Sequence, residues 1–177
     1  SPLQGHPHRQ SLPGIETSSG PLGSGLSQAA GMALGLKMDN MSNRVFCLTS
    51  DGEHQEGNTW EAVIFAAKYK LDNLTQIIDR NRIQIDGKTE DVMPLGSIAD
   101  KYRSFGWNVI DIDGNDVDVI ISALANAKAR KGAPTIIVAN TVPGKGVSFM
   151  ENRFEWHGRT PTKEEAARAL NELGVTK

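Results

Sequence analysis

Residues 45–81 read VFCLTSDGEHQEGNTWEAVIFAAKYKLDNLTQIIDRN, and this stretch decides the fold. Two short apolar runs, residues 45–49 and 74–78, each end in polar turn residues, which predicts two buried strands. The apolar spacing of residues 59–69 predicts a helix between them. A strand, a helix and a second strand in this order predict two parallel strands joined by a right-handed crossover.

The same alternation continues along the rest of the chain. Further strands are predicted over residues 108–112 and 135–139, and further helices over residues 22–38, 97–105, 117–130 and 163–173. Thr162, followed three positions later by Glu165, predicts a capping box at the start of the last helix. Alternating strands and helices predict an α/β fold in which a parallel sheet has helices on both faces, and 177 residues suit one domain.

The composition argues against nucleic-acid and membrane partners. The chain has 19 Lys and Arg against 21 Asp and Glu, and no stretch combines basic with aromatic residues as a nucleic-acid surface does. Apolar runs such as residues 136–139 are far shorter than the ~20 residues of a membrane-spanning helix. The single cysteine, Cys47, is expected to be buried in a protein of a reducing compartment. We therefore expect a cytoplasmic protein with small-molecule or protein partners.

Ligands of parallel α/β sheets bind at the carboxyl ends of the strands, so the residues that follow each strand are candidates for a site. Asp51 and Asn81 each follow a predicted strand and are 30 positions apart. A right-handed unit brings both to one edge of the sheet, where a carboxylate, an amide oxygen and a nearby backbone carbonyl suit an octahedral Mg²⁺ site. The alternative is that Asp51 starts a turn and Asn81 caps a loop, because both residue types are common in turns.

The glycine-rich segments do not have the spacing of nucleotide-binding loops. A phosphate-binding loop ending in Gly87-Lys88-Thr89 needs glycine at position 82, which is Arg. The glycines of residues 20–25 lack the dinucleotide-binding spacing, and no apolar strand precedes them. A glycine-rich loop that opens a helix can still receive a phosphate or an aromatic ring.

Two histidines and one glutamate are candidates for acid–base chemistry. His6 and His157 lie in glycine-bearing loops, and histidine titrates near neutral pH, which suits proton transfer. Glu56 lies near the start of the second predicted helix. The alternative is that both histidines are solvated loop residues and that Glu56 only offsets the positive end of the helix dipole.

In their order along the chain, these motifs resemble the thiamine-diphosphate-binding domain of transketolases, and most closely the separate N-terminal subunit of split transketolases. The matching strings are LPGIETSSGPLGSGLS (12–27), TSDGEHQEGNTWEA (49–62), IIDRNRIQIDG (77–87), FGWNVIDIDG (105–114), PGKGVSFMEN (143–152) and WHG (156–158). The resemblance extends over almost the whole chain. The resemblance implies a thiamine diphosphate-binding fold over residues 1–177.

The resemblance also implies how the cofactor is held. Asp51, the Asn81 side chain and the Ile83 carbonyl are implied to hold Mg²⁺, which bridges to the diphosphate of thiamine diphosphate. The backbone of Gly52 is implied to contact the same diphosphate.

Further roles are implied around the cofactor rings and the substrate. The loop formed by Gly20, Pro21 and Leu22 is implied to pack on the cofactor rings. His6 and His157 are implied to lie near the diphosphate and the reacting groups of the substrate. Glu56 is implied to link two cofactor sites across a subunit interface.

Two features depart from the family pattern. Ser50 replaces the first glycine of the usual Gly-Asp-Gly, and its Cβ is expected to crowd the cofactor and weaken its binding. The resemblance also leads us to expect that an N-terminal segment with further histidines and the pyrimidine-binding domain with its activating glutamate lie outside these 177 residues. We therefore expect a partner, the C-terminal pyrimidine-domain subunit of a transketolase, in a heterotetramer with two copies of each subunit.

The implied reaction, in the pentose phosphate pathway, transfers a two-carbon ketol unit from a ketose phosphate to an aldose phosphate, with thiamine diphosphate and Mg²⁺ as cofactors. One alternative is another thiamine-diphosphate enzyme subunit, similar to deoxyxylulose-phosphate synthase or to the alpha subunit of a 2-oxoacid dehydrogenase. Another is a non-catalytic subunit that binds the cofactor and a partner. The WHG string after GKGVSFMEN favours transketolase.

Overall fold

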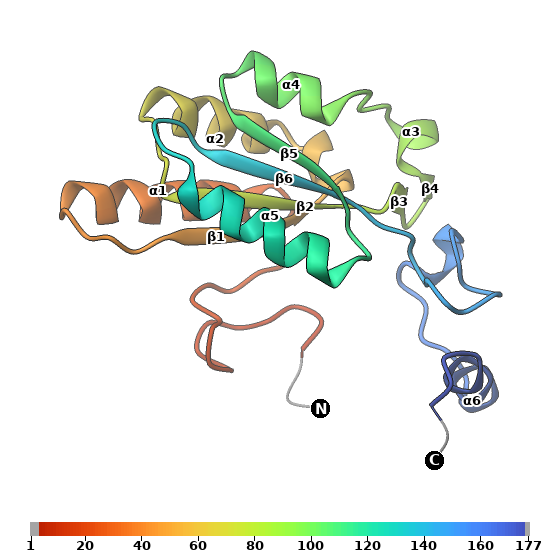
Figure 1. Ribbon diagram of the computed structural model, residues 1–177. Helices are drawn as coiled ribbons and strands as arrows, with labels where there is room; N and C mark the ends of the chain where they lie inside the picture. Colours follow the sequence, from red (N-terminus) through yellow and green to blue (C-terminus); the bar gives the residue numbers. More distant parts are fainter. Residues whose placement is uncertain (1–3, 176–177) are drawn as a thin grey trace.

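The computed structural model describes residues 4–175, and its centre is a parallel sheet with helices on both faces (Figure 1). The sheet has the strand order β1–β2–β6–β5, and all neighbouring strands run parallel. Its strands are β1 (Val45–Ser50), β2 (Leu74–Arg80), β5 (Asn108–Asp113) and β6 (Thr135–Asn140). All four coincide with predicted strands, and the predicted α/β fold class is confirmed.

Helices cover both faces of this sheet. The structure contains α1 (Ser24–Met38), α2 (Gly57–Lys68), α3 (Thr89–Val92), α4 (Ile98–Ser104), α5 (Val117–Ala129) and α6 (Lys163–Glu172). Helices α1, α2 and α4 pack on one face, against Ile78 and Ile136, whereas α5 packs on the other, against Ile77 and Ile137. Because neighbouring residues of a strand point to opposite faces, the apolar residues of β2 and β6 supply both cores.

Small residues bring α1 close to its neighbours. Ala29, Ala30 and Ala33 are buried in the core that α1 shares with α2 and β1. A side chain on Gly25 would place its Cβ 3.7 Å from Cys47 Sγ. Cys47 is buried, as predicted, and burial, assisted by the nearby Glu53 carboxylate, raises the pKa of its thiol to about 12.

Several short elements were not predicted. The chain after β2 forms a two-stranded hairpin of β3 (Ile83–Gln84) and β4 (Gly87–Lys88), followed by α3. Two single-turn 3₁₀ helices, η1 (Gly52–Gln55) and η2 (Phe154–Trp156), follow β1 and precede α6. Such elements are too short to show a helical or strand period.

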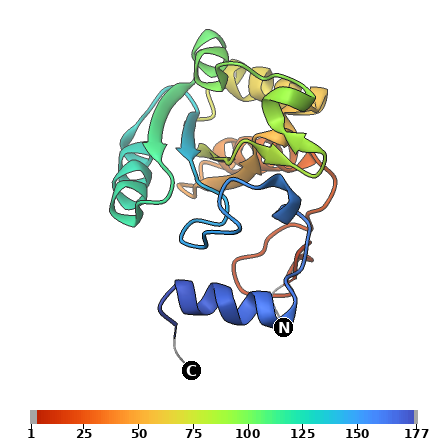
Figure 2. The ribbon, with the colours of Figure 1, turned by 90° about the vertical axis from the view of Figure 1, so that its right-hand side faces the viewer.

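The last helix lies apart from the sheet, at the side on which the strands end (Figures 1 and 2). Thr162 and Glu165 form the predicted capping box at its start. The end of this helix contacts the loop after β6, because Glu172 Oε1 accepts a hydrogen bond of 3.0 Å from Ser148 Oγ. Across residues 4–175, none of the helices combines the length and hydropathy needed to cross a membrane.

Candidate functional site

The two predicted metal ligands lie at the same edge of the sheet. Ser50 pairs with Asp79 in the register of β1 and β2, so the loops that follow these strands start side by side. The Asp51 carboxylate contacts the second loop directly, because its Oδ2 accepts a hydrogen bond of 2.7 Å from the backbone N–H of Arg82. The structure thus places Asp51 against the loop that carries Asn81.

Asp51 is completely buried, and both of its oxygens have partners. Oδ1 accepts a hydrogen bond of 2.7 Å from the backbone N–H of Gly52, and the Thr89 hydroxyl lies 3.5 Å away. Oδ2 accepts a second bond, of 2.8 Å, from Arg80 Nη1. Gly52, whose backbone the resemblance implies to contact the cofactor diphosphate, directs its N–H at Asp51.

Asn81 is fixed by its own loop. Its Oδ1 accepts a hydrogen bond of 3.0 Å from the backbone N–H of Ile83, and its Nδ2 donates one of 2.8 Å to Asp79 Oδ2. Arg82, between Asn81 and Ile83, has a φ of 64°, in the left-handed region. This turn directs the Arg82 N–H toward Asp51 while Asn81 remains beside Ile83.

A cavity of about 270 Å³ adjoins this loop. Its lining includes Asn81 after β2, Ile83 of β3, Gly144 from the loop after β6, and His157 from the loop before α6. Asp51 is not among the lining residues. The structure thus brings together three of the predicted site residues, Asn81, Ile83 and His157, from distant parts of the sequence.

The predicted residues of the N-terminal segment do not line this cavity. His6 is exposed, and Leu22, in the loop formed by Gly20, Pro21 and Leu22, is 58% exposed. Residues 9–18 line a separate open hollow of about 1080 Å³ with Gln28 and Met32. The structure therefore does not place His6 and His157 at one cavity.

Sequence analysis gave no role to Glu53, which connects two of the predicted site loops. Its Oε1 accepts a hydrogen bond of 2.7 Å from the backbone N–H of Gly23, and its Oε2 accepts one of 3.3 Å from that of Ser50. Glu56, three positions further, is exposed and makes no capping hydrogen bond to α2. The sequence contains no signal that distinguishes these two glutamates, because both lie near the start of a helix.

Ser50 takes part in the same turn. Its hydroxyl accepts a hydrogen bond of 3.2 Å from the backbone N–H of Glu53, and its carbonyl lies 2.7 Å from His54 Nδ1. Because a carbonyl only accepts hydrogen bonds, Nδ1 of His54 carries the proton. The serine in place of the family's glycine thus stabilises the turn that holds Asp51.

His54, in a polar stretch of the sequence, is completely buried. Its Nε2 lies 2.9 Å from the Tyr102 hydroxyl and 3.3 Å from Gln76 Nε2, and Tyr102 donates to Gln76 Oε1 at 2.7 Å. Burial, together with the nearby Arg80 and Lys101 charges, lowers the pKa of His54 to about 4, and the hydrogen bond to Ser50 opposes the shift. His54 is therefore neutral near pH 7.

These features define an α/β domain whose loops at the carboxyl edge of a parallel sheet suit a ligand with hard oxygen atoms. A family model described as "Transketolase, thiamine diphosphate binding domain" matches residues 1–177. The chain belongs to this transketolase family.

The similar proteins are transketolases or their subunits. One subunit of the apulose-4-phosphate transketolase of Phocaeicola vulgatus is 43% identical over 97% of this chain and 60% of that protein. The 6-deoxy-6-sulfo-D-fructose transketolase subunit SqwG of Clostridium sp. is 42% identical over 97% of this chain and 62% of that protein. The structure of transketolase from Leishmania mexicana is 31% identical, with a TM-score of 0.87, over 98% of this chain and 28% of that one. The chain thus spans about 60% of the length of the two transketolase subunits that it matches.

Proposed function

We propose that this chain is the diphosphate-binding part of a transketolase, which moves a two-carbon ketol unit from a ketose phosphate to an aldose phosphate. Membership of the transketolase family supports this reaction class. The observation that carries the proposal is the cavity shared by Asn81, Ile83 and His157, because it combines oxygen donors with a group able to transfer a proton. Thiamine diphosphate and Mg²⁺ are its proposed cofactors.

The residues that follow β1 and β2 fit a hard divalent cation. Mg²⁺ prefers oxygen ligands and binds proteins through one or two carboxylates together with phosphate oxygens of a ligand. Asp51 supplies a carboxylate, Asn81 an amide oxygen and Ile83 a backbone carbonyl, and the bond from Arg82 N–H to Asp51 joins these groups. We propose that these three residues hold Mg²⁺ and that Gly52 lies against the diphosphate.

Bound thiamine diphosphate supplies the carbanion chemistry by which carbon–carbon bonds are broken and made. The residues of this chain bind, orient and move protons. His157, exposed on the cavity wall, is proposed to accept and return a proton at an imidazole nitrogen. His6 is proposed to do the same from the N-terminal segment.

The remaining site residues are proposed to complete the cofactor environment. Gly20, Pro21 and Leu22 are proposed to pack on the cofactor rings, and Glu56 to link cofactor sites across a subunit interface. The names of the two relatives described above identify them as subunits. We propose that this chain likewise works in the cytoplasm with a second subunit that carries the pyrimidine-binding domain, with two copies of each.

The proposed function is tested by measuring ketol transfer between pentose phosphates in a mixture of this chain with the pyrimidine-domain subunit of a transketolase. We expect transfer, and we expect His157→Asn to lower kcat/KM by about 10²–10⁴-fold, the usual contribution of a general acid or base. His8→Asn, at another exposed histidine, is the matched control and is expected to leave the rate unchanged. Turnover of pyruvate with no transfer between pentose phosphates would contradict the proposal.

A further inference from the structure

The buried Asp51 carboxylate has a resident counter-ion. Arg80 Nη1 lies 2.8 Å from Asp51 Oδ2, and the Asp51 side chain has no exposed surface. A carboxylate buried without a compensating positive charge is strongly unfavourable. Arg80 therefore supplies the positive charge that compensates the buried Asp51 carboxylate.

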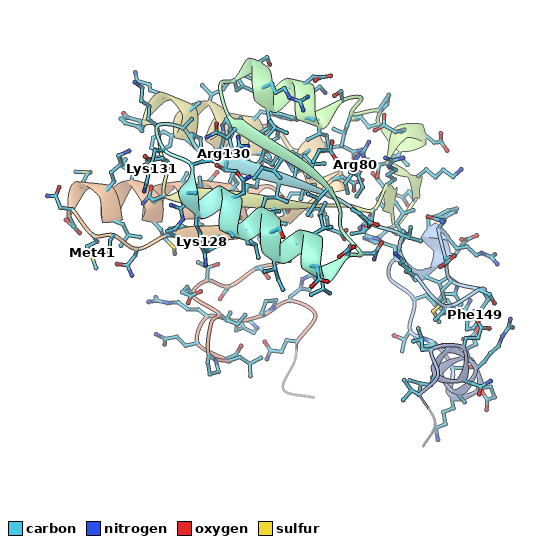
Figure 3. The ribbon with its side chains drawn as sticks, in the orientation of Figure 1. Met41, Arg80, Lys128, Arg130, Lys131 and Phe149 are labelled. Carbon is cyan, nitrogen blue, oxygen red and sulfur yellow. The ribbon has the colours of Figure 1, made fainter. Side chains whose placement is uncertain are left out.

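Arg80 is also held from its other side. Its Nη2 lies 2.7 Å from Glu90 Oε1, and the other Glu90 oxygen accepts hydrogen bonds of 3.1 Å from the backbone N–H groups of Leu95 and Gly96. Burial opposes ionisation of Glu90, but the bonds from Arg80 and from these N–H groups hold its pKa below the usual value. The guanidinium is thus anchored independently of Asp51. Figure 3 shows Arg80 at the end of the sheet from which β3, β4 and α3 extend.

Asp51, Arg80 and Glu90 form a charged cluster, and their charges determine how strongly it attracts a cation. Two carboxylates and one guanidinium leave one net negative charge. A divalent cation at Asp51 must share the carboxylate with Arg80, and the two positive charges repel each other strongly away from bulk water. Removing the guanidinium should strengthen the attraction for the cation, whereas neutralising Glu90 should weaken it.

We propose that Arg80 sets the divalent-cation affinity of the Asp51 site: it holds the carboxylate in place without metal and competes with the metal for it. This inference rests on the proposed function, in which Asp51 is a metal ligand. Arg80 acts through Asp51, so it is a positioning residue. Its competition with metal is visible in metal affinity and in metal-dependent stability.

The test is titration of the full chain with Mn²⁺ alone, with free Mn²⁺ counted by electron paramagnetic resonance. We expect Arg80→Gln to bind Mn²⁺ about tenfold more tightly and Glu90→Gln about tenfold more weakly. Arg103→Gln, which removes an exposed arginine paired with Asp100 on α4, changes the net charge equally and is expected to leave the Kd unchanged. General structural damage would weaken binding in both cluster variants, so opposite shifts identify the electrostatic role.

Thermal unfolding gives an independent readout. In EDTA, Arg80→Gln is expected to melt about 5–10 °C below wild type, because a buried charge has lost its partner, and Mg²⁺ is expected to restore most of the loss. If Arg80→Gln does not fold with or without Mg²⁺, the Mn²⁺ affinity of Glu90→Gln is the deciding measurement. Weaker Mn²⁺ binding by Glu90→Gln supports the inference, and unchanged or tighter binding refutes it.

The Mn²⁺ titration of Asp51→Asn distinguishes failure of this inference from failure of the proposed metal site. If Asp51→Asn abolishes Mn²⁺ binding but neither cluster variant shifts the Kd, the metal site stands and the role of Arg80 is refuted. If Asp51→Asn binds Mn²⁺ as wild type does, the metal assignment in the proposed function is wrong and the inference falls with it.

Discussion

Gly23 precedes α1 with a φ of 78°, in the left-handed region that L side chains rarely adopt. A Cβ on Gly23 would lie 2.0 Å from Asn58 Oδ1 and 2.8 Å from Glu56 Cβ. The glycine therefore lets the predicted ring-binding loop pass close to the start of α2.

We expect Gly23→Ala to lower the free energy of unfolding by about 2 kcal/mol or more, since it adds both backbone strain and overlap. Gly31→Ala is the matched control, because Gly31 lies within α1 and an added Cβ there meets no atom within 4 Å. That variant is expected to gain roughly 0.5–1 kcal/mol from helix propensity. Urea denaturation measures both; equal effects of the two substitutions would contradict the assigned geometry.

Because His54 is buried, the free energy of unfolding is expected to fall as the pH falls. The folded pKa of about 4 lies below the ordinary value of 6.5, so the unfolded chain binds more protons between these values. The contribution of neutral His54 to the free energy of unfolding is therefore fully present above about pH 6.5 and is lost as the pH falls toward 4. A shift of this size corresponds to about 3 kcal/mol at most.

We expect the free energy of unfolding to fall between pH 6.5 and 5, where few carboxylates titrate. His54→Gln should remove most of this slope, whereas His8→Gln, at an exposed histidine, should retain it. Urea denaturation across this pH range is the measurement. A slope that survives in His54→Gln would show that another group causes it.

At the scale of elements, Glu53 joins the loop before α1 to the end of β1. Its carboxylate accepts hydrogen bonds from the backbone N–H groups of Gly23 and Ser50 at 2.7 and 3.3 Å. Hydrogen bonds to charged groups contribute about 1.5–3 kcal/mol each. Glu53 thus couples the loop proposed to contact the cofactor rings to the turn that holds Asp51.

We expect Glu53→Gln to destabilise the chain by about 1–2 kcal/mol and to speed amide hydrogen exchange at Gly23 and Ser50, because the amide is a weaker acceptor and has only one carbonyl oxygen. Glu61→Gln, at an exposed position on α2, is the matched control. Unchanged exchange at both amides in Glu53→Gln would show that the carboxylate does not hold the two loops together.

Helices and strands long enough to show an apolar pattern were predictable from the sequence, and shorter ones were not. Residues 74–78, Leu-Thr-Gln-Ile-Ile, are mostly apolar or β-favouring because β2 is covered on both faces, and the structure extends this strand to Arg80. The β3–β4 hairpin has two residues in each strand, so its sequence shows no alternation. Its conformation depends on the turn at Arg82 and on contacts with Asp51, which are tertiary.

At the scale of the whole molecule, chain order was enough to place Asp51 and Asn81 at one edge of the sheet. Parallel strands joined by a right-handed crossover have no other arrangement available. The cavity shared with His157 depends on the path of residues 141–162, which no local period encodes. Resemblance to the transketolase family, and not spacing, is what singled out His157.

Buried polar partners were the least predictable part of the site. Arg80, Glu53 and His54 lie in polar sequence that resembles a solvated turn, yet Arg80 and His54 are buried. Their partners Gly23, Asp51, Glu90 and Tyr102 come from separate parts of the chain, so only the folded chain shows the pairing. Charged residues at the ends of buried strands are therefore worth testing for such pairs.

Calorimetric titration of the chain with thiamine diphosphate measures whether Asp51 anchors a metal-bound diphosphate. We expect wild-type chain to bind the cofactor with Mg²⁺ and not with EDTA, and Asp51→Asn to lose at least about 100-fold in affinity. Asp39→Asn, at an exposed carboxylate after α1, should bind as wild type does. Equal affinity of Asp51→Asn and wild type, or wild-type binding that is unchanged by EDTA, would contradict this role of Asp51.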